Sequence, residues 1–172
     1  MSTNETEQES VSEDDRTRAL RESIRRSFPV EPYKGKVTEH DGEFPDHFDD
    51  DTAILDEEKE LYDALRGKAW TAVPTEIFQH QPSGYGLLTD EAFRAFLPAW
   101  LMRSLDHIGE KNEVRDFAVY SFSHTMRQFR VLNPEQQLTV RSLLVEFAER
   151  GTSRFVANLA KEAVALIDRR RY

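Results

Sequence analysis

The hydrophobic pattern of the chain is clearest between residues 87 and 101, where large apolar side chains recur at helical spacing. Phe93, Phe96, Leu97, Trp100 and Leu101 follow the i, i+3, i+4, i+7, i+8 pattern. This spacing places all five side chains on one face of a helix. The pattern therefore predicts a central helix whose aromatic face is buried in the core.

Polar residues specify how this central helix begins. Thr89 is a typical N-cap residue, and Asp90 and Glu91 oppose the positive end of the helix dipole. Pro98 lacks the N–H that would bond the carbonyl of Arg94, so a kink or a break into two short helices is expected there. We interpret Pro98 as a residue that shapes packing.

Two further helices are predicted before the central one. Leu20, Ile24 and Phe28 recur at i, i+4, i+8, which indicates a short amphipathic helix ended by Pro29. A second helix is predicted over residues 52–66, with Gly67 as a left-handed C-terminal cap. The residues between them, 30–51, contain prolines and glycines and predict an irregular connection. The second helix is expected to bury Ile54, Leu55, Leu61, Tyr62 and Leu65.

Shorter or mixed patterns lie on either side of the central helix. Residues 70–78 predict a single helical turn entered through Pro74, docked by Trp70, Ile77 and Phe78. Asn112 can cap a helix that reaches residue 122. The alternation of residues 119–123 leaves a strand as the alternative. The residues expected to face inward in this helix are Val114, Phe117, Ala118 and Phe122.

The C-terminal part of the chain predicts two helices. Asn133, Pro134 and Gln136 form a strong start signal, with a cap, a proline at the first position and a glutamine three residues after the cap. This helix is expected to stop at Gly151 and to be followed by a last helix from Ser153. The inward residues are Val140, Leu143, Leu144 and Phe147 in the first, and Phe155, Leu159, Ala163, Leu166 and Ile167 in the second.

These elements predict an all-α fold, a single compact multi-helix domain packed as an antiparallel helix bundle. A short helical-repeat-like stack is the alternative, because two similar helix starts, at Leu88 and Leu132, lie about 44 residues apart. Residues 1–15 are acidic and almost without apolar side chains, so we expect a disordered acidic N-terminal tail. Residues 16–50 are expected to form a short helix and an irregular acidic linker, and residues 51–172 the all-α core domain.

Composition and charge narrow the possible partners. The 172 residues carry a formal net charge of −9, which argues against binding to nucleic acid or to an anionic membrane surface. The start of the chain lacks the pattern of a signal peptide, and no apolar run approaches the roughly 20 residues of a membrane span. A cytoplasmic location is therefore expected. Because the chain has no cysteine, thiolate nucleophiles and cysteine-ligated zinc are excluded.

Few residues indicate chemistry. Residues 40–51 hold two histidines and six carboxylates, but their spacing fits no metal-binding motif, so we expect a solvated acidic loop without a metal. The neighbours Asp106 and His107, and His124 beside Ser121 and Ser123, have structural explanations, and no catalytic motif occurs. We therefore assign no catalytic residue and no cofactor. Arginines and aromatics typical of interface centres suggest a possible interface at Arg94, Arg103, Tyr120, His124, Arg127 and Arg130.

One stretch of sequence carries a resemblance to other proteins. Residues 87–101, read with residues 65–70 before them and residues 131–136 after them, contain a Leu-Thr-x-Glu-Ala-Phe-Arg-x-x-Leu-Pro motif. The chain over residues 51–147 resembles an uncharacterised family of small bacterial all-helical proteins. The resemblance implies a widespread core module with a variable region at residues 1–50, and it implies no established activity.

The sequence therefore favours a non-enzymatic, cytoplasmic interaction module that acts through protein–protein contacts, because packing signals are abundant and catalytic motifs are not. Two alternatives are kept. One is a small enzyme or metal-dependent protein that uses the acidic loop and His124. The other is an acidic inhibitor or immunity-type protein that covers a basic partner. The sequence specifies neither the identity of the partner nor the oligomeric state.

Overall fold

The computed structural model describes residues 4–44, 52–124, 126–151 and 153–169, of which residues 4–14, 52, 53, 126 and 127 are described by their backbone alone. The helices are α1 (Asn4–Ser27), α2 (Thr52–Leu65), α3 (Glu76–His80), α4 (Asp90–Ser104), α5 (Glu113–His124), α6 (Met126–Arg130), α7 (Pro134–Arg150) and α8 (Arg154–Arg169), with 3-10 turns η1 (Trp70–Ala72) and η2 (Gly84–Leu87). Within these ranges the only extended pairing is an isolated bridge between Thr38 and Leu88. The predicted all-α, single-domain fold is confirmed.

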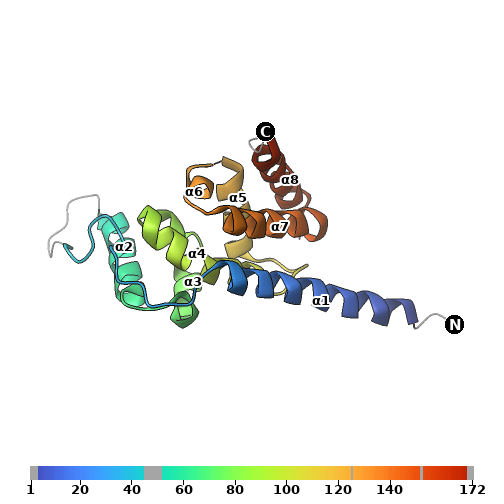
Figure 1. Cartoon of the computed structure of the whole chain (residues 1–172), viewed down its shortest axis with the longest axis horizontal. Helices are drawn as coiled ribbons and strands as arrows, with labels where there is room; N and C mark the ends of the chain where they lie inside the picture. Colours follow the sequence, from blue (N-terminus) through green and yellow to red (C-terminus); the bar gives the residue numbers. More distant parts are fainter. Residues whose placement is uncertain (1–3, 45–51, 125, 152, 170–172) are drawn as a thin grey trace.

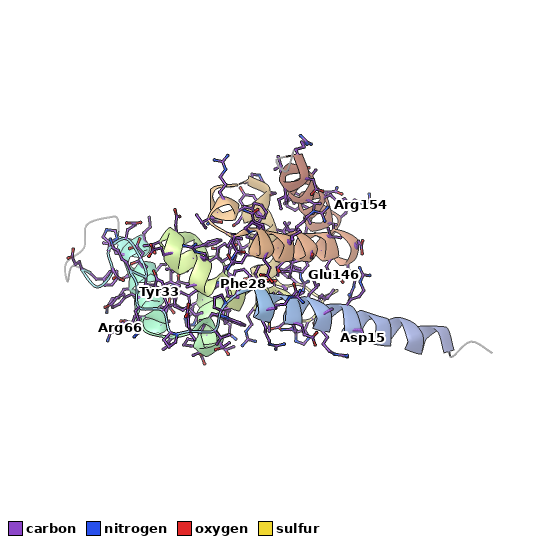
Figure 2. All side chains as sticks on the ribbon, viewed as in Figure 1. Asp15, Phe28, Tyr33, Arg66, Glu146 and Arg154 are labelled. Carbon is purple, nitrogen blue, oxygen red and sulfur yellow. The ribbon has the colours of Figure 1, made fainter. Side chains whose placement is uncertain are left out.

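The helices pack as neighbours around α4. Helix α7 packs against both α1 and α8, and α5 packs against both α4 and α8, while α1 also contacts α4 (Figure 1). At the interface of α1 and α7, Glu146 lies between the two helices, where it pairs with Arg16 at 2.9 Å (Figure 2). This arrangement leaves α2 and α3 at one end of the molecule and α8 at the opposite side of α7 from α1.

The aromatic face of α4 forms the middle of the core, as predicted. Trp100 and Phe96 are fully buried. The Trp100 ring meets Phe78 edge to face at 5.2 Å between centroids and Tyr85 at 5.9 Å, and its indole N–H donates to the carbonyl of Gln81 at 3.2 Å. Burial raises the pKa of Tyr85 to about 12. The hydrophobic core is therefore organised around Trp100, whose indole N–H is hydrogen-bonded.

The predicted helix signals are confirmed at three positions. Thr89 Oγ1 accepts a hydrogen bond from the amide of Ala92, Asn133 and Gln136 form a reciprocal capping box, and Gly67 has a φ of +69°. Pro98 lies inside the single continuous helix α4, so of the two alternatives predicted there, a kink or a break into two helices, the break does not occur. Packing of the buried Pro98 turn on its neighbours holds the helix together in spite of the missing N–H.

Helix α1 includes part of the acidic N-terminal segment. The backbone of α1 begins at Asn4, within the segment expected to be a disordered tail, and its first turns extend beyond the rest of the molecule (Figure 1). Glutamates are good helix formers, and their charge is favourable near a helix N-terminus. Residues 1–3 of that segment lie outside the described residues.

The segment after α1 packs on the core rather than acting only as a linker. Val37 and Thr38 are buried, and the Tyr33 ring meets Phe96 edge to face at 5.5 Å. The carbonyl of Val37 accepts a hydrogen bond from the amide of Thr89 at 3.1 Å. Residues 30–44 thus help to seat the start of α4, a contact between distant parts of the chain that periodicity does not report.

Several predicted burial and element assignments are wrong. Ile54, Phe117 and Phe155 were expected to face inward, but they are 54%, 42% and 68% exposed. The residues expected to form one turn entered at Pro74 instead form η1 and then α3, which begins after Thr75. Residues 119–123 are helical, so the strand alternative is wrong. Helix α5 buries Val114, Arg115, Ala118, Val119 and Phe122, and α8 buries Val156, Ala160, Ala163 and Ile167.

Candidate functional site

Phe117 and Phe155, the two aromatic residues that were predicted to face inward but are exposed, lie in one groove between α5 and α8. This groove, called here the α5/α8 groove, has a volume of about 560 Å³. Phe117 and Tyr120 of α5 line one wall, and Phe155, Val156 and Leu159 of α8 line the other. Three exposed aromatic rings in one hollow form the kind of apolar patch that marks binding surfaces.

The rim of the α5/α8 groove carries an incompletely paired carboxylate. Asp116 lines the groove with Lys111, Glu113 and Ser153. Its Oδ1 is buried and has no hydrogen-bond partner among the described residues. Burial raises the pKa of Asp116, an effect that the charges of Arg115 and Lys111 oppose. The groove therefore offers a hydrogen-bond acceptor that a donor from outside the chain can satisfy.

Two predicted interface residues belong to the same side of α5. Tyr120 is 51% exposed, and the His124 ring stacks on it at 4.2 Å with an interplanar angle of 22°. His124 Nδ1 lies 2.7 Å from Ser123 Oγ and 3.1 Å from the carbonyl oxygen of Tyr120. These local contacts account for the position of His124, and they extend the aromatic surface beside the groove by one ring.

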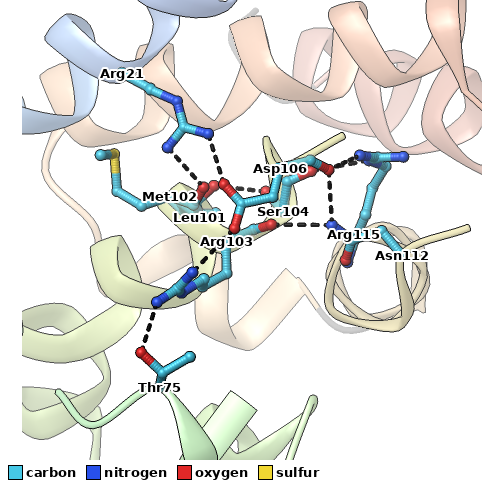
Figure 3. Close-up of polar contacts among 9 residues, drawn as sticks. All are labelled: Arg21, Thr75, Leu101, Met102, Arg103, Ser104, Asp106, Asn112 and Arg115. Carbon is cyan, nitrogen blue, oxygen red and sulfur yellow. Dashed lines mark hydrogen bonds and ion pairs between the residues drawn. The ribbon is translucent and has the colours of Figure 1, made fainter. Parts of the chain in front are cut away.

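A second candidate site is a cavity of about 270 Å³ between α1, η1 and α4, called here the arginine cavity. Three arginines line it, Arg21 and Arg25 from α1 and Arg103 from α4, together with the carboxylate of Asp106. Arg21 donates to Asp106 Oδ1 at 2.7 Å and to the carbonyl of Met102 at 3.1 Å (Figure 3). Arg103 donates to Asp106 Oδ2 at 3.2 Å. Two guanidinium groups thus hold one carboxylate.

The backbone beneath Asp106 is held by a buried arginine. Arg115 is fully buried and donates to the carbonyls of Ser104 and Asp106, both at 2.8 Å (Figure 3). It also donates to the carbonyl of Glu110 at 3.1 Å. Asn112 adds bonds to the carbonyls of Arg103 and Asp106. These donors satisfy carbonyls at and beyond the C-terminal end of α4, which helices otherwise leave unpaired.

The other predicted interface residues do not join these two sites. Arg94 is exposed on α4 and lines a third hollow, beside Tyr33 and Glu91. Arg130 is exposed at the end of α6. The side chain of Arg127 lies outside the described residues. Of the five predicted positions whose side chains are described, only Tyr120 and His124 are close together.

Among the described residues, the histidines considered in the sequence lie in local structural contacts. Asp106 bonds two arginines, and His107 follows it with a left-handed φ of 48°. Two histidine–carboxylate pairs appear elsewhere: His40 Nδ1 lies 2.5 Å from Glu58, and His80 Nδ1 lies 2.8 Å from Glu60. A hydrogen bond from Gln81 is the main cause that lowers the pKa of Glu60, and His80 adds to it. The partners are 18 and 20 residues apart in sequence, which hides them from motif analysis.

Neither a cluster of metal ligands nor a membrane-spanning helix occurs in the described part of the chain. There, no group of three or more histidine, cysteine, aspartate or glutamate side chains is arranged to hold a metal ion. The candidate acidic loop is described only up to residue 44, and residues 45–51 lie outside the described residues. None of the helices in the described ranges is long and apolar enough to cross a membrane.

Comparisons with protein families, with curated proteins and with solved structures gave no match to this chain.

Proposed function

We propose that this chain is a protein-interaction module and that its α5/α8 groove binds an amphipathic helix of a partner protein. The observation that carries the proposal is the convergence of three exposed aromatic rings, those of Phe117, Tyr120 and Phe155, on one groove. Large aromatics supply most of the binding energy at protein interfaces, particularly where a pocket surrounds them. An exposed Phe has no comparable role in stabilising the fold itself.

The geometry of the groove favours a helix as its occupant. Both walls are helices, and the described part of the chain has no strand whose edge could pair with an extended peptide. Recognition by strand addition requires such an edge, whereas recognition of a helix requires an apolar groove that accepts side chains at i, i+3, i+4 and i+7. We therefore expect an occupant with apolar residues at this spacing.

The charge of the groove favours a basic residue beside that apolar face. Glu113 and Asp116 outnumber Lys111 on the rim, and the chain as a whole has a net charge of −9. Lysine or arginine from the partner can donate to the unpartnered Oδ1 of Asp116, which relieves the cost of a buried acceptor. A basic amphipathic helix is thus the partner chemistry that we propose.

A display library of helical peptides selected on the full chain is expected to enrich sequences with helically spaced apolar residues and one flanking Lys or Arg. Phe155→Ser should weaken binding of these peptides by about tenfold or more, because it removes an aromatic anchor from the groove. Fluorescence anisotropy with a labelled selected peptide measures the change.

Leu138→Ser provides the matched control. Leu138 is 48% exposed on α7 and does not line the groove, so its substitution should leave peptide affinity within about twofold of the wild type. Asp116→Asn should abolish the selection of the basic residue while apolar selection persists. Equal weakening by Phe155→Ser and Leu138→Ser, or selection of peptides without helical spacing, contradicts the proposal.

A further inference from the structure

The arginine cavity concentrates positive charge in an acidic protein. Arg21, Arg25 and Arg103 line it against the single carboxylate of Asp106. The remaining lining residues are uncharged, whereas the whole chain carries a net charge of −9. Charges of one sign in a hollow with apolar walls attract the opposite charge more strongly than charges on an open surface do. The local field thus favours an anion at a place where the overall charge does not.

The three arginines differ in the number of hydrogen bonds and ion pairs that they form. Arg21 bonds Asp106 and the carbonyl of Met102, and Arg103 bonds Asp106 and Thr75 Oγ1 at 2.9 Å. Arg25, one helical turn after Arg21, has no hydrogen bond or ion pair with any described residue. Its guanidinium is therefore the cation available to a ligand, while the other two are fixed in position beside it.

The uncharged lining of the cavity includes two aromatic residues, and one of them carries an indole donor without a hydrogen-bond partner among the described residues. Trp70 and Phe78 line it, and the Arg103 guanidinium carbon lies 5.2 Å from the centre of the Phe78 ring. Trp70 is 5% exposed, and its indole Nε1 is buried without a hydrogen-bond partner among the described residues. In contrast, the indole of Trp100 donates to a backbone carbonyl. A buried N–H without an acceptor is uncommon and is stabilised when a ligand oxygen accepts its bond.

We infer that the arginine cavity binds a small organic anion, a carboxylate or a phosphate ester whose charge pairs with Arg25 and whose apolar group lies against Phe78. A volume of about 270 Å³ suits a ligand of one ring, since an engineered cavity of about 150 Å³ is enough for benzene. Arginine forms two parallel hydrogen bonds with carboxylate and with phosphate, so either anion can bind the same residues. This site is separate from the α5/α8 groove and does not depend on the function proposed for it.

The test is a titration of the full chain with benzoate, phenyl phosphate and neutral benzamide. Binding is monitored through the two tryptophan indole cross-peaks in ¹H–¹⁵N spectra. The cross-peak of Trp70, assigned with Trp70→Phe, is expected to shift and saturate with an anion, and that of Trp100 to remain in place. Benzamide, which has the shape of benzoate without its charge, should bind about tenfold more weakly or not at all. The tighter of the two anions identifies the charged group as carboxylate or phosphate.

Arg25→Gln and Arg26→Gln form a matched pair of variants. Both remove one positive charge from exposed positions of α1, but Arg26 does not line the cavity and lies 3.7 Å from Glu135 instead. Arg25→Gln should weaken anion binding by about tenfold, whereas Arg26→Gln should change it by less than about twofold. Equal effects of the two variants, or the absence of a saturating shift at Trp70 with either anion, overturn the inference.

Discussion

Trp100→Ala is expected to lower the free energy of unfolding by about 3 to 5 kcal/mol, the usual penalty for emptying a large aromatic site in a core. Trp100 is fully buried, and its loss also removes edge-to-face contacts with Phe78 and Tyr85. It further leaves the carbonyl of Gln81 without its indole donor. Because whole domains are stable by only about 5 to 15 kcal/mol, this variant is close to unfolding.

Urea denaturation followed by far-ultraviolet circular dichroism measures this change without relying on tryptophan fluorescence. Arg94→Ala is the control on the same helix, since Arg94 is exposed, and it should cost less than about 1 kcal/mol. A Trp100→Ala protein with the stability of the Arg94→Ala protein contradicts the assignment of this face of α4 to the core.

The sequence predicted the helices of this fold well where the signals are local. A cap such as Thr89 or Asn133 is a hydrogen bond within one turn, so the residue types alone are enough to locate it. The apolar stripe of α4 was equally clear, because one face of that helix carries nearly all its large side chains. These are the elements whose predicted burial the structure confirms.

In α5 and α8 most of the predicted inward residues are buried, among them Val114, Ala118 and Phe122 of α5, but one aromatic residue of each helix was assigned wrongly. The inward face of α5 includes Arg115, which a hydrophobic pattern excludes, so the stripe was assigned through Phe117 instead. With Arg115 included, Ala118, Val119 and Phe122 follow at i+3, i+4 and i+7. In α8 the buried residues are Val156, Ala160, Ala163 and Ile167, so the predicted burial of Ala163 and Ile167 is confirmed and that of Phe155 is wrong.

The wrong assignments of Phe117 and Phe155 have the same physical origin, and the two residues lie in the same groove. Aromatic residues were assigned to the core because most of them are buried, yet Phe117 and Phe155 line the same exposed groove. Exposed apolar groups conflict with the rules that stabilise a fold, and such conflicts concentrate at functional sites. The arginine cavity was hidden for another reason, since Arg25 and Arg103 come from helices that the sequence alone does not bring together.

Arg115→Met is expected to destabilise the protein by about 3 to 5 kcal/mol, because each buried carbonyl left without its donor costs about 1 to 3 kcal/mol. Methionine keeps much of the length and apolar volume but donates no hydrogen bond. The carbonyls of Ser104, Asp106 and Glu110 then lose a donor in the interior. Burial already lowers the pKa of Arg115, so the guanidinium is retained for these bonds at a cost in desolvation.

Thermal and urea unfolding of Arg115→Met and Arg115→Lys, with the exposed Arg130→Met as control, test this role. Lysine preserves the charge but not the planar fork that reaches three carbonyls, so its stability should lie between the wild type and Arg115→Met. Arg130→Met should stay within about 0.5 kcal/mol of the wild type. If Arg115→Met does the same, the end of α4 is held without Arg115. If it is destabilised as expected, the buried arginine is the donor that holds the C-terminal end of α4 beneath the arginine cavity.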